Sequence, residues 1–287
     1  LNYGDLPVLS GAPLQRLVSG GLRKPKHQIL GDDIAGRVEA VGVKVKHFQP
    51  GDDVFGISVF GAFAEYVCAG EKYLALKPGG ISFEQAAALP LAGITALHAL
   101  RDSGQIREGS KVLINGASGG VGTFAVQIAK SFGAEVTGVC STNKLDLVSS
   151  IGTDQVIDYT QEDFNQKGQL YDLILAVGGH HPIAAYRRAL NPEGIYVCVG
   201  GSMAQYFQAL LMGPIISMMG DKKMGIVFPK PNQKDLDFLA ELVKSGKVAP
   251  VIDRYYPLSE VPEALGYLDR GQARGKVVIT VVTNDKT

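Results

Sequence analysis

Residues 111–133 read KVLINGASGGVGTFAVQIAKSFG, and this stretch decides the fold. It begins with Val112-Leu113-Ile114, a short continuous apolar run of the kind that forms a strand buried on both faces. Beyond a glycine-rich turn, apolar side chains recur at the spacing of one helical face, at Val121, Phe124, Ala125, Ile128, Ala129 and Phe132. Gly133 ends this predicted helix. The stretch therefore predicts a strand, a glycine turn and an amphipathic helix of an α/β sheet.

The residues after this stretch repeat the same alternation of strand and helix. Further buried strands are expected at Val136–Val139, Val156–Ile157, Leu173–Val177, Ile195–Val199 and, as the sixth and final strand, Gly225–Phe228. A last long helix is expected at Gln233–Ser245. Strands that alternate with helices at this spacing predict a doubly wound parallel sheet of the Rossmann type.

The residues before the stretch have a different pattern, with short β-prone segments between turns. These segments are Asp32–Val41, Val54–Ile57, Ala62–Cys68 and Tyr73–Leu76. They predict a small antiparallel unit, to which we also assign the C-terminal segment Lys276–Val282. The expected domains are therefore a β-rich domain of residues 1–88 and 252–287 and a Rossmann domain of residues 89–251.

Composition excludes several classes of protein. The chain has 287 residues, with 28 Lys and Arg against 28 Asp and Glu, so its formal net charge is zero. That balance does not suit a surface for nucleic acid or anionic lipid, and no apolar run reaches the ~18 residues of a membrane span. The three cysteines, Cys68, Cys140 and Cys198, lie far apart without zinc-ligand spacing. A reducing, cytoplasmic location is the default expectation.

The glycine-rich turn Asn115–Gly122 stands where a dinucleotide fold needs a phosphate loop. Ala117, Gly119 and Gly122 have the spacing of a G-x-G-x-x-G motif whose first Gly is replaced by Ala. Glycines let the backbone approach a pyrophosphate, and a helix N-terminus offers free amides to it. The pyrophosphate-binding residues are therefore expected to be Ser118, Gly119, Gly120 and Val121. The alternative is a plain glycine turn of another α/β protein.

The end of the second strand indicates which dinucleotide would bind. An NAD site usually places Asp or Glu there, to bind the ribose 2′-hydroxyl, but this chain has Ser141, Thr142, Asn143 and Lys144. Hydroxyls and an ammonium suit a 2′-phosphate, so we expect NADP(H). In the alternative interpretation, Thr142 caps the next helix and Lys144 is solvated, and both interpretations can hold together.

The chain resembles the zinc-independent quinone and enone reductases of the medium-chain dehydrogenase/reductase (MDR) superfamily. The matching stretches are LGDDIAGRVEAVG (30–42), PGDDVFG (50–56), AFAEYV (62–67), PLAGITA (90–96), INGASGGVG (114–122), VIDY (156–159) and ARGKVV (273–278). The resemblance implies a GroES-like substrate domain beside a Rossmann domain, with the active site between them. It also implies that early strands of the GroES-like domain precede residue 1.

The resemblance bears on metal binding as well. Zinc alcohol dehydrogenases of the superfamily ligate zinc through Cys, His and Cys, and the matching positions here are Asn2, Asp32 and Leu91. Asn is a poor zinc ligand and Leu is none, so no metal site is expected.

Further site residues follow from the resemblance. Without zinc, a site for an enone or a quinone must align the substrate with the nicotinamide and donate hydrogen bonds to the developing enolate oxygen. Asn2 and Tyr3 are the expected catalytic residues, although Asn2 also suits a simple turn. The expected cofactor-binding set is completed by Thr95, Tyr159, Val177, Gly178, Gly200, Gly201 and Lys276. The pair His180-His181 is more typical of a solvated loop than of a proton donor.

These observations predict an NADPH-dependent oxidoreductase without zinc, acting on an α,β-unsaturated carbonyl or a quinone. An NADP(H)-binding sensor with little turnover and a zinc alcohol dehydrogenase are the alternatives. A homodimer is expected, because Gly225–Phe228 would leave one strand edge unpaired for a second copy. Coverage of this edge by Met212–Met219 would instead give a monomer.

Overall fold

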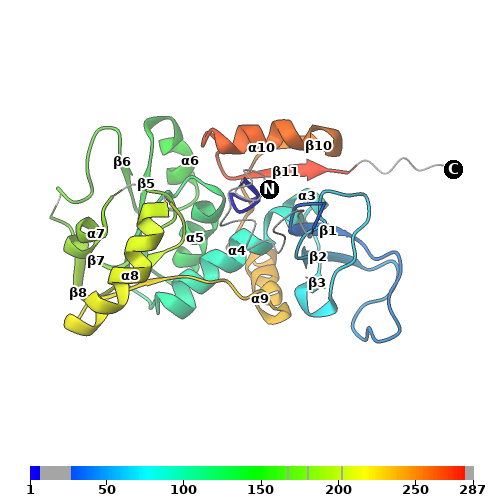
Figure 1. Ribbon diagram of the computed structural model, residues 1–287, viewed down its shortest axis with the longest axis horizontal. Helices are drawn as coiled ribbons and strands as arrows, with labels where there is room; N and C mark the ends of the chain where they lie inside the picture. Colours follow the sequence, from blue (N-terminus) through cyan, green and yellow to red (C-terminus); the bar gives the residue numbers. More distant parts are fainter. Residues whose placement is uncertain (7–26, 167, 180, 202, 282–287) are drawn as a thin grey trace. The chain divides into compact units, whose positions relative to one another are not determined.

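The computed structural model describes residues 1–6, 27–166, 168–179, 181–201 and 203–281 (Figure 1). The chain forms two compact units. One comprises Leu1–Ile94, Pro231–Gly246 and Pro250–Thr287, and the other comprises Thr95–Lys230 and Lys247–Ala249. We call the first the β-rich unit and the second the Rossmann unit, and each is described by itself.

The Rossmann unit contains a six-stranded parallel sheet in the order β6-β5-β4-β7-β8-β9. Its strands are β4 (Lys111–Asn115), β5 (Glu135–Cys140), β6 (Gln155–Asp158), β7 (Tyr171–Ala176), β8 (Leu190–Cys198) and β9 (Lys223–Ile226). The strands follow one another outward from β4, first to one side and then to the other, which is the strand order of a doubly wound fold. The fold class predicted from the sequence is confirmed.

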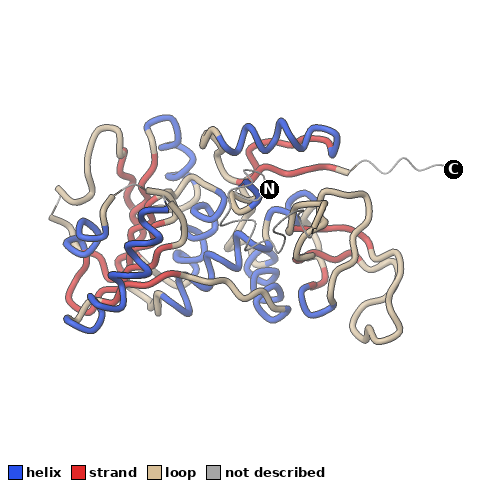
Figure 2. The backbone as a smooth tube through the Cα atoms, in the orientation of Figure 1, coloured by secondary structure: helices blue, strands red, loops and turns tan. Residues whose placement is uncertain are grey.

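Helices cover both faces of this sheet. They are η2 (His98–Ser103), α5 (Gly120–Ser131), η3 (Thr142–Lys144), α6 (Leu145–Ser150), α7 (Ile183–Ala189) and α8 (Met203–Met219). Figures 1 and 2 show α5 and α6 on one face and α7 and α8 on the other. Because both faces are covered, Val112, Leu113 and Ile114 of β4 are fully buried.

The last strand of the sheet begins two residues earlier than the sequence predicts. β9 ends at Ile226, and Val227 continues the pairing only through its N–H, which donates to the Cys198 oxygen at 3.1 Å. Phe228 is 70% exposed and lies outside the strand. The apolar run predicts a strand as far as Phe228, but the ladder with β8 ends at Ile226, and Pro229 follows Phe228.

The β-rich unit has an antiparallel sheet, β1 (Asp33–Arg37), β2 (Asp53–Ile57) and β3 (Leu74–Leu76), and a parallel pair, β10 (Ile252–Pro257) and β11 (Lys276–Thr280). Its helical elements are η1 (Glu71–Tyr73), α3 (Phe83–Ala88), α9 (Gln233–Lys244), η4 (Leu258–Glu260) and α10 (Val261–Asp269). The chain divides between the two units within α4 (Pro90–Leu97). A capping box of Ser82 and Gln85 opens α3, because each side chain satisfies an amide of the other residue.

One predicted strand of this unit does not form. Residues 62–68 are irregular, although their composition is β-prone. The chain turns sharply just before them, where Val59, Phe60 and Gly61 all have positive φ angles. The amides that follow donate to carbonyls of residues 29–31 instead of a strand of the sheet, so this contact replaces a regular ladder.

Candidate cofactor and active site

The glycine turn between β4 and α5 has the geometry that its sequence predicts. Gly116 has a φ of +93°, and a Cβ atom there would lie 2.7 Å from the Gly178 nitrogen. A Cβ atom on Gly122 would lie 2.1 Å from the Gly116 oxygen. Only glycine allows both approaches, so the turn and the first turn of α5 are packed against each other.

The start of α5 has the features of an anion site. Gly119 is its N-cap residue and provides no side-chain cap, so the first amides of the helix have no capping oxygen from that residue. A Cβ atom on Gly119 would meet only the Gly116 oxygen, at 3.7 Å. The remaining space and the unblocked amides of Gly120 and Val121 fit the pyrophosphate of a dinucleotide.

The loops after β7 and β8 lie at the same edge of the sheet as the glycine turn. The amides of Val177 and Gly178 both donate to the Asn115 oxygen, at 2.9 and 3.0 Å. The amide of Gly200 donates to the Ala176 oxygen, and a Cβ atom on Gly200 would lie 2.3 Å from the Val177 oxygen. The structure thus places four groups of predicted cofactor residues at this edge. They are residues 118–121, 141–144, 177–178 and 200–201. Ligands of open α/β sheets bind at this edge.

A buried polar network, which the sequence did not reveal, lies beneath these loops. The Asn115 amide nitrogen donates to the Tyr186 hydroxyl at 2.8 Å, and Gln205 donates to the hydroxyls of Tyr186 and Tyr196 at 3.4 and 3.1 Å. Burial raises the pKa of Tyr186 to about 12. The network joins β4, α7, β8 and α8 and so fixes the strand ends that carry the loops. His181 packs edge-on against Tyr186, whereas His180 lies outside the described residues.

At the end of β5, the predicted 2′-phosphate residues form a short helical turn, η3. The Ser141 hydroxyl donates to the Asn143 side-chain oxygen at 2.7 Å. Thr142 does not cap a helix, because its hydroxyl donates to the Asp158 carboxylate at 2.5 Å. The part of the alternative interpretation that made Thr142 a cap is therefore wrong. Lys144 is half-buried in the same turn.

Two other predicted cofactor residues lie at different places. Tyr159 follows β6 and is 60% exposed, while its amide donates to the Cys140 oxygen. Thr95 is buried within α4, which is not one of the elements that end at this sheet edge.

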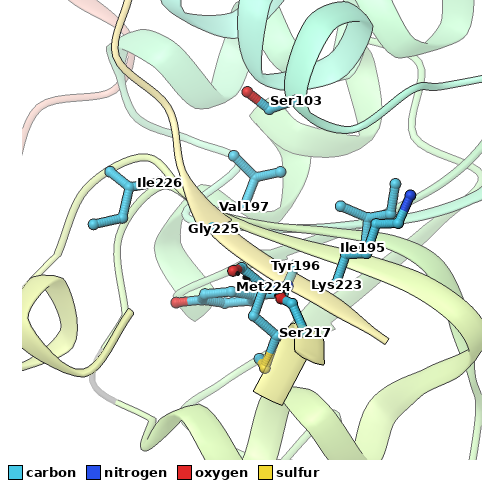
Figure 3. A pocket seen from close by; sticks show the side chains of 9 residues that line it. All are labelled: Ser103, Ile195, Tyr196, Val197, Ser217, Lys223, Met224, Gly225 and Ile226. Atoms are coloured by element: carbon cyan, nitrogen blue, oxygen red, sulfur yellow. Dashed lines mark hydrogen bonds between the residues drawn. The ribbon is translucent and has the colours of Figure 1, made fainter. Parts of the chain in front are cut away.

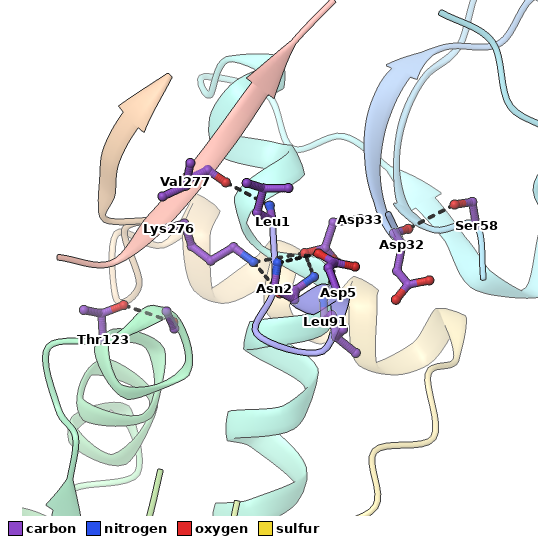
Figure 4. A network of polar contacts seen from close by, with 11 residues as sticks. Leu1, Asn2, Asp5, Asp32, Asp33, Ser58, Leu91, Thr123, Lys276 and Val277 are labelled. Atoms are coloured by element: carbon purple, nitrogen blue, oxygen red, sulfur yellow. Dashed lines mark hydrogen bonds and ion pairs between the residues drawn. The ribbon is translucent and has the colours of Figure 1, made fainter. Parts of the chain in front are cut away.

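The β-rich unit contains a second candidate site, built around Lys276 (Figure 4). The Lys276 ammonium donates to the Asn2 side-chain oxygen at 2.6 Å and to Asp33 Oδ2 at 3.1 Å. The Asn2 side-chain nitrogen donates to the same Asp33 oxygen at 3.0 Å, and the Leu91 amide donates to the other at 2.8 Å. The side chains of Lys276 and Asp33 are 2% and 4% exposed. Two residues predicted for different roles, Asn2 and Lys276, therefore touch, and Asp33 is a member that sequence reasoning missed.

Tyr3 lies apart from this network. It is 54% exposed, and its hydroxyl is 3.7 Å from the position of a Cβ atom on Gly271, just after α10. Burial and the nearby Asp269 carboxylate raise its pKa.

The residues that match zinc-ligand positions have other partners. Asp32 accepts a hydrogen bond from the Phe60 amide, Asn2 belongs to the Lys276 network, and Leu91 offers only its backbone. Within the described ranges, no group of three His, Cys, Asp or Glu side chains is placed to hold a metal ion. None of the described helices combines the length and hydrophobicity that a bilayer crossing requires.

A separate cavity of about 280 Å³ lies beside β8 and β9 (Figure 3). It is lined by Ser103, Ile195, Tyr196, Val197, Ser217, Lys223, Met224, Gly225 and Ile226. Lys223 is its only charged lining residue, and the cavity contains none of the predicted site residues.

The family models and known proteins to which this chain is similar are dehydrogenases and oxidoreductases. Residues 1–79 match the family model "Alcohol dehydrogenase GroES-like domain", and residues 151–279 match "Zinc-binding dehydrogenase". The chain is 37% identical over 278 residues to the mitochondrial NAD(P)H oxidoreductase RTN4IP1 of Mus musculus, covering 88% of this chain and 70% of that protein. It is 35% identical to the chloroplastic NADPH-dependent alkenal/one oxidoreductase of Arabidopsis thaliana, covering 89% and 64%. Among solved structures, the quinone oxidoreductase from Coxiella burnetii has a TM-score of 0.85 at 32% identity, covering 98% of this chain and 87% of that one.

Proposed function

Because the chain belongs to the zinc-independent quinone and enone oxidoreductases of the MDR superfamily, we propose that it reduces a quinone or an α,β-unsaturated carbonyl at the expense of NADPH. It is an oxidoreductase enzyme that uses a nicotinamide cofactor, which supplies the hydride when bound. The proposal rests above all on one observation, the contact between Asn2 and Lys276. The names of the relatives support the substrate classes and the reduced cofactor.

The residues at the sheet edge of the Rossmann unit would hold the cofactor. The stretch 118–121 would bind the pyrophosphate, through the backbone amides of Gly120 and Val121, and the turn of residues 141–144 would bind a 2′-phosphate. The strand ends at 177–178 and 200–201 offer backbone groups for the remaining part of the cofactor. Thr95, Tyr159 and Lys276 stay in the proposed set on the strength of the family resemblance.

Asn2 would donate a hydrogen bond to the substrate oxygen. Its amide nitrogen carries two hydrogens, and one is directed to Asp33. The Lys276 ammonium on the Asn2 oxygen draws electron density from the amide, which makes its remaining N–H a stronger donor. A preorganised donor of this kind stabilises negative charge as it develops on an enolate or hydroquinone oxygen.

Steady-state oxidation of NADPH with panels of enones and quinones tests this function. We expect turnover on at least one class, and a loss of roughly 100-fold in kcat for Asn2→Ala, the effect of removing one oxyanion donor. The Kd for NADPH should be unchanged in that variant. Tight binding of NADPH without turnover on any acceptor would instead favour a sensor, and stoichiometric zinc in the purified protein would favour a zinc alcohol dehydrogenase.

A homodimer is also part of the proposal, although the edge of β9 is less open than the sequence suggested. The Met224 amide donates to the Ser217 hydroxyl of α8 at 3.0 Å. Part of the edge is therefore covered by the segment 212–219, as the monomer alternative expects, and a dimer would have to form through another surface. On the outer side of α8, Phe207, Leu210, Leu211, Ile215 and Met218 are 49–87% exposed. Such an apolar surface suits contact with a second copy.

Light scattering of the wild type and of Leu211→Asp tests the dimer. We expect a dimer that the charged variant weakens, and a wild type that is monomeric at micromolar concentration would contradict it. Val227→Pro is a poor probe, because the Val227 amide pairs within the chain, with Cys198. A cytoplasmic location stays a prediction, since the names of the two relatives place them in mitochondria and chloroplasts.

A further inference from the structure

A carboxylate does lie beside the end of β5, and the neighbouring strand β6 provides it. Asp158 is the last residue of β6, and in the parallel register it pairs with Cys140, the last residue of β5. The next residues after Cys140 are the predicted 2′-phosphate residues 141–144. The sequence predicts NADP(H) because residues 141–144 contain no Asp or Glu, but the sheet places Asp158, the register partner of Cys140, beside this point.

Asp158 is held firmly, and the groups that hold it are neutral. Its Oδ2 accepts from the Thr142 hydroxyl at 2.5 Å, and its Oδ1 accepts from the amide and the hydroxyl of Thr160 at 2.9 and 2.8 Å. The residue is 9% exposed. The hydrogen bond from Thr142, followed by those from Thr160, lowers the pKa of Asp158. The carboxylate is therefore a fixed negative charge at neutral pH.

These contacts change what Thr142 can offer a phosphate. A threonine hydroxyl has one hydrogen to donate, and that of Thr142 points to Asp158. A phosphomonoester needs donors, so Thr142 has none for it while this bond exists. The single hydroxyl hydrogen of Ser141 is likewise directed to the Asn143 side-chain oxygen. The side chains of η3 that can donate to a 2′-phosphate are then those of Asn143 and Lys144.

We propose that Asp158 determines cofactor specificity by weakening the preference for NADPH, so that the site also accepts NADH. Its charge repels the 2′-phosphate that Lys144 attracts, and its bond to Thr142 removes one donor from that phosphate. In NAD-binding folds the carboxylate after the second strand has this discriminating effect, and here the third strand provides it. The inference rests on the proposed placement of the 2′-phosphate at 141–144.

Two nucleotide fragments isolate the effect, because they differ in the 2′-phosphate alone. Isothermal titration of the full chain with 2′,5′-ADP and with 5′-AMP measures the preference directly. In Asp158→Asn, we expect about fivefold to tenfold tighter binding of 2′,5′-ADP, the size of a like-charge interaction of a few ångströms near water. The gain should shrink as salt is added, and binding of 5′-AMP should change by less than about twofold. The Asn amide can donate to the Thr142 oxygen, which frees the threonine hydrogen for the phosphate.

Thr142→Val is the matched control, because it removes the hydroxyl and keeps both the shape and the Asp158 charge. We expect less than about a twofold change in the binding of 2′,5′-ADP. A tenfold loss would show that Thr142 donates to the phosphate and would overturn the proposal. Asp158→Ser, a smaller neutral replacement, serves as the second test if the Asn variant melts at a lower temperature than the wild type.

The outcomes separate this inference from the proposed function. If the wild type prefers 2′,5′-ADP and neither neutral variant increases that preference, Asp158 is not the discriminating residue, while the NADPH assignment stands. If the wild type and Lys144→Ala bind both fragments equally, the placement of the 2′-phosphate at 141–144 is wrong, and the inference fails with it. Loss of 5′-AMP binding in both neutral variants would show a structural role for Asp158 and would also overturn the proposal.

Discussion

Asp33 and Asp158 are both buried carboxylates at strand ends, yet the chain holds them in opposite ways. Asp33 of the β-rich unit accepts from an ammonium, Lys276, as well as from Asn2 and the Leu91 amide. Asp158 of the Rossmann unit accepts from the hydroxyls of Thr142 and Thr160 and from a backbone amide. A carboxylate paired with a cation adds little net charge to its surroundings. A carboxylate held by neutral dipoles keeps its charge, which a ligand nearby will feel.

The largest expected effect comes from breaking the charged pair. Asp33→Asn leaves the Lys276 ammonium buried without its counter-ion, and such a loss costs about 3–5 kcal/mol of the free energy of unfolding. Urea denaturation measures this value. The double variant Asp33→Asn/Lys276→Met should recover much of the loss, since neither charge is then buried. Equal destabilisation in the single and double variants would contradict the pairing.

The next prediction concerns Lys144, the cation at the predicted 2′-phosphate turn of the Rossmann unit. Lys144→Ala should weaken the binding of NADPH by roughly 1–3 kcal/mol, the range for a hydrogen bond to a charged group. Binding of NADH should be nearly unchanged, because it has no 2′-phosphate. Fluorescence titration with both cofactors measures the two effects. Equal losses of affinity for NADPH and NADH would contradict the placement of the 2′-phosphate at this turn.

The sequence predicted the parts of these sites that depend on local patterns. The strand, glycine turn and α5 follow from apolar periodicity and glycine spacing within a single stretch, and all three are present. The Asn2–Lys276 contact joins residues 274 positions apart, so no local pattern could reveal it, and only the family resemblance suggested the two residues. Asp158 was missed for a similar reason. Its place beside β5 depends on strand order and register, which are properties of the folded sheet.

Tyr186 is a third buried group that can lose a proton, and its burial favours the neutral form. Tyr186 has an ordinary pKa of 10.0, which burial raises to about 12. A group whose folded pKa is raised contributes stability below its unfolded pKa and loses it as the pH rises through the folded value. Stability should therefore fall between pH 10 and 12, by about 2 kcal/mol for this residue.

Tyr186→Phe tests that assignment. At pH 9 the variant should be about 1–3 kcal/mol less stable than the wild type, because the Asn115 amide loses its acceptor. The difference should shrink or reverse as the pH approaches 12, since the variant has no phenol to ionise at this position. A constant difference across this range in chemical denaturation would mean that Tyr186 does not titrate with folding.

The smallest effect is expected where a carboxylate meets a cation at the surface. Arg37 and Asp53 pair across β1 and β2 at 2.9 Å, a shorter contact than that between Lys276 and Asp33, but their side chains are 66% and 34% exposed. Water and salt screen an exposed pair, so Asp53→Asn should cost less than about 1 kcal/mol. Comparing this variant with Asp33→Asn under the same conditions separates burial from distance. If Asp53→Asn proved as costly as Asp33→Asn, the importance of the Lys276 network could not be attributed to its burial.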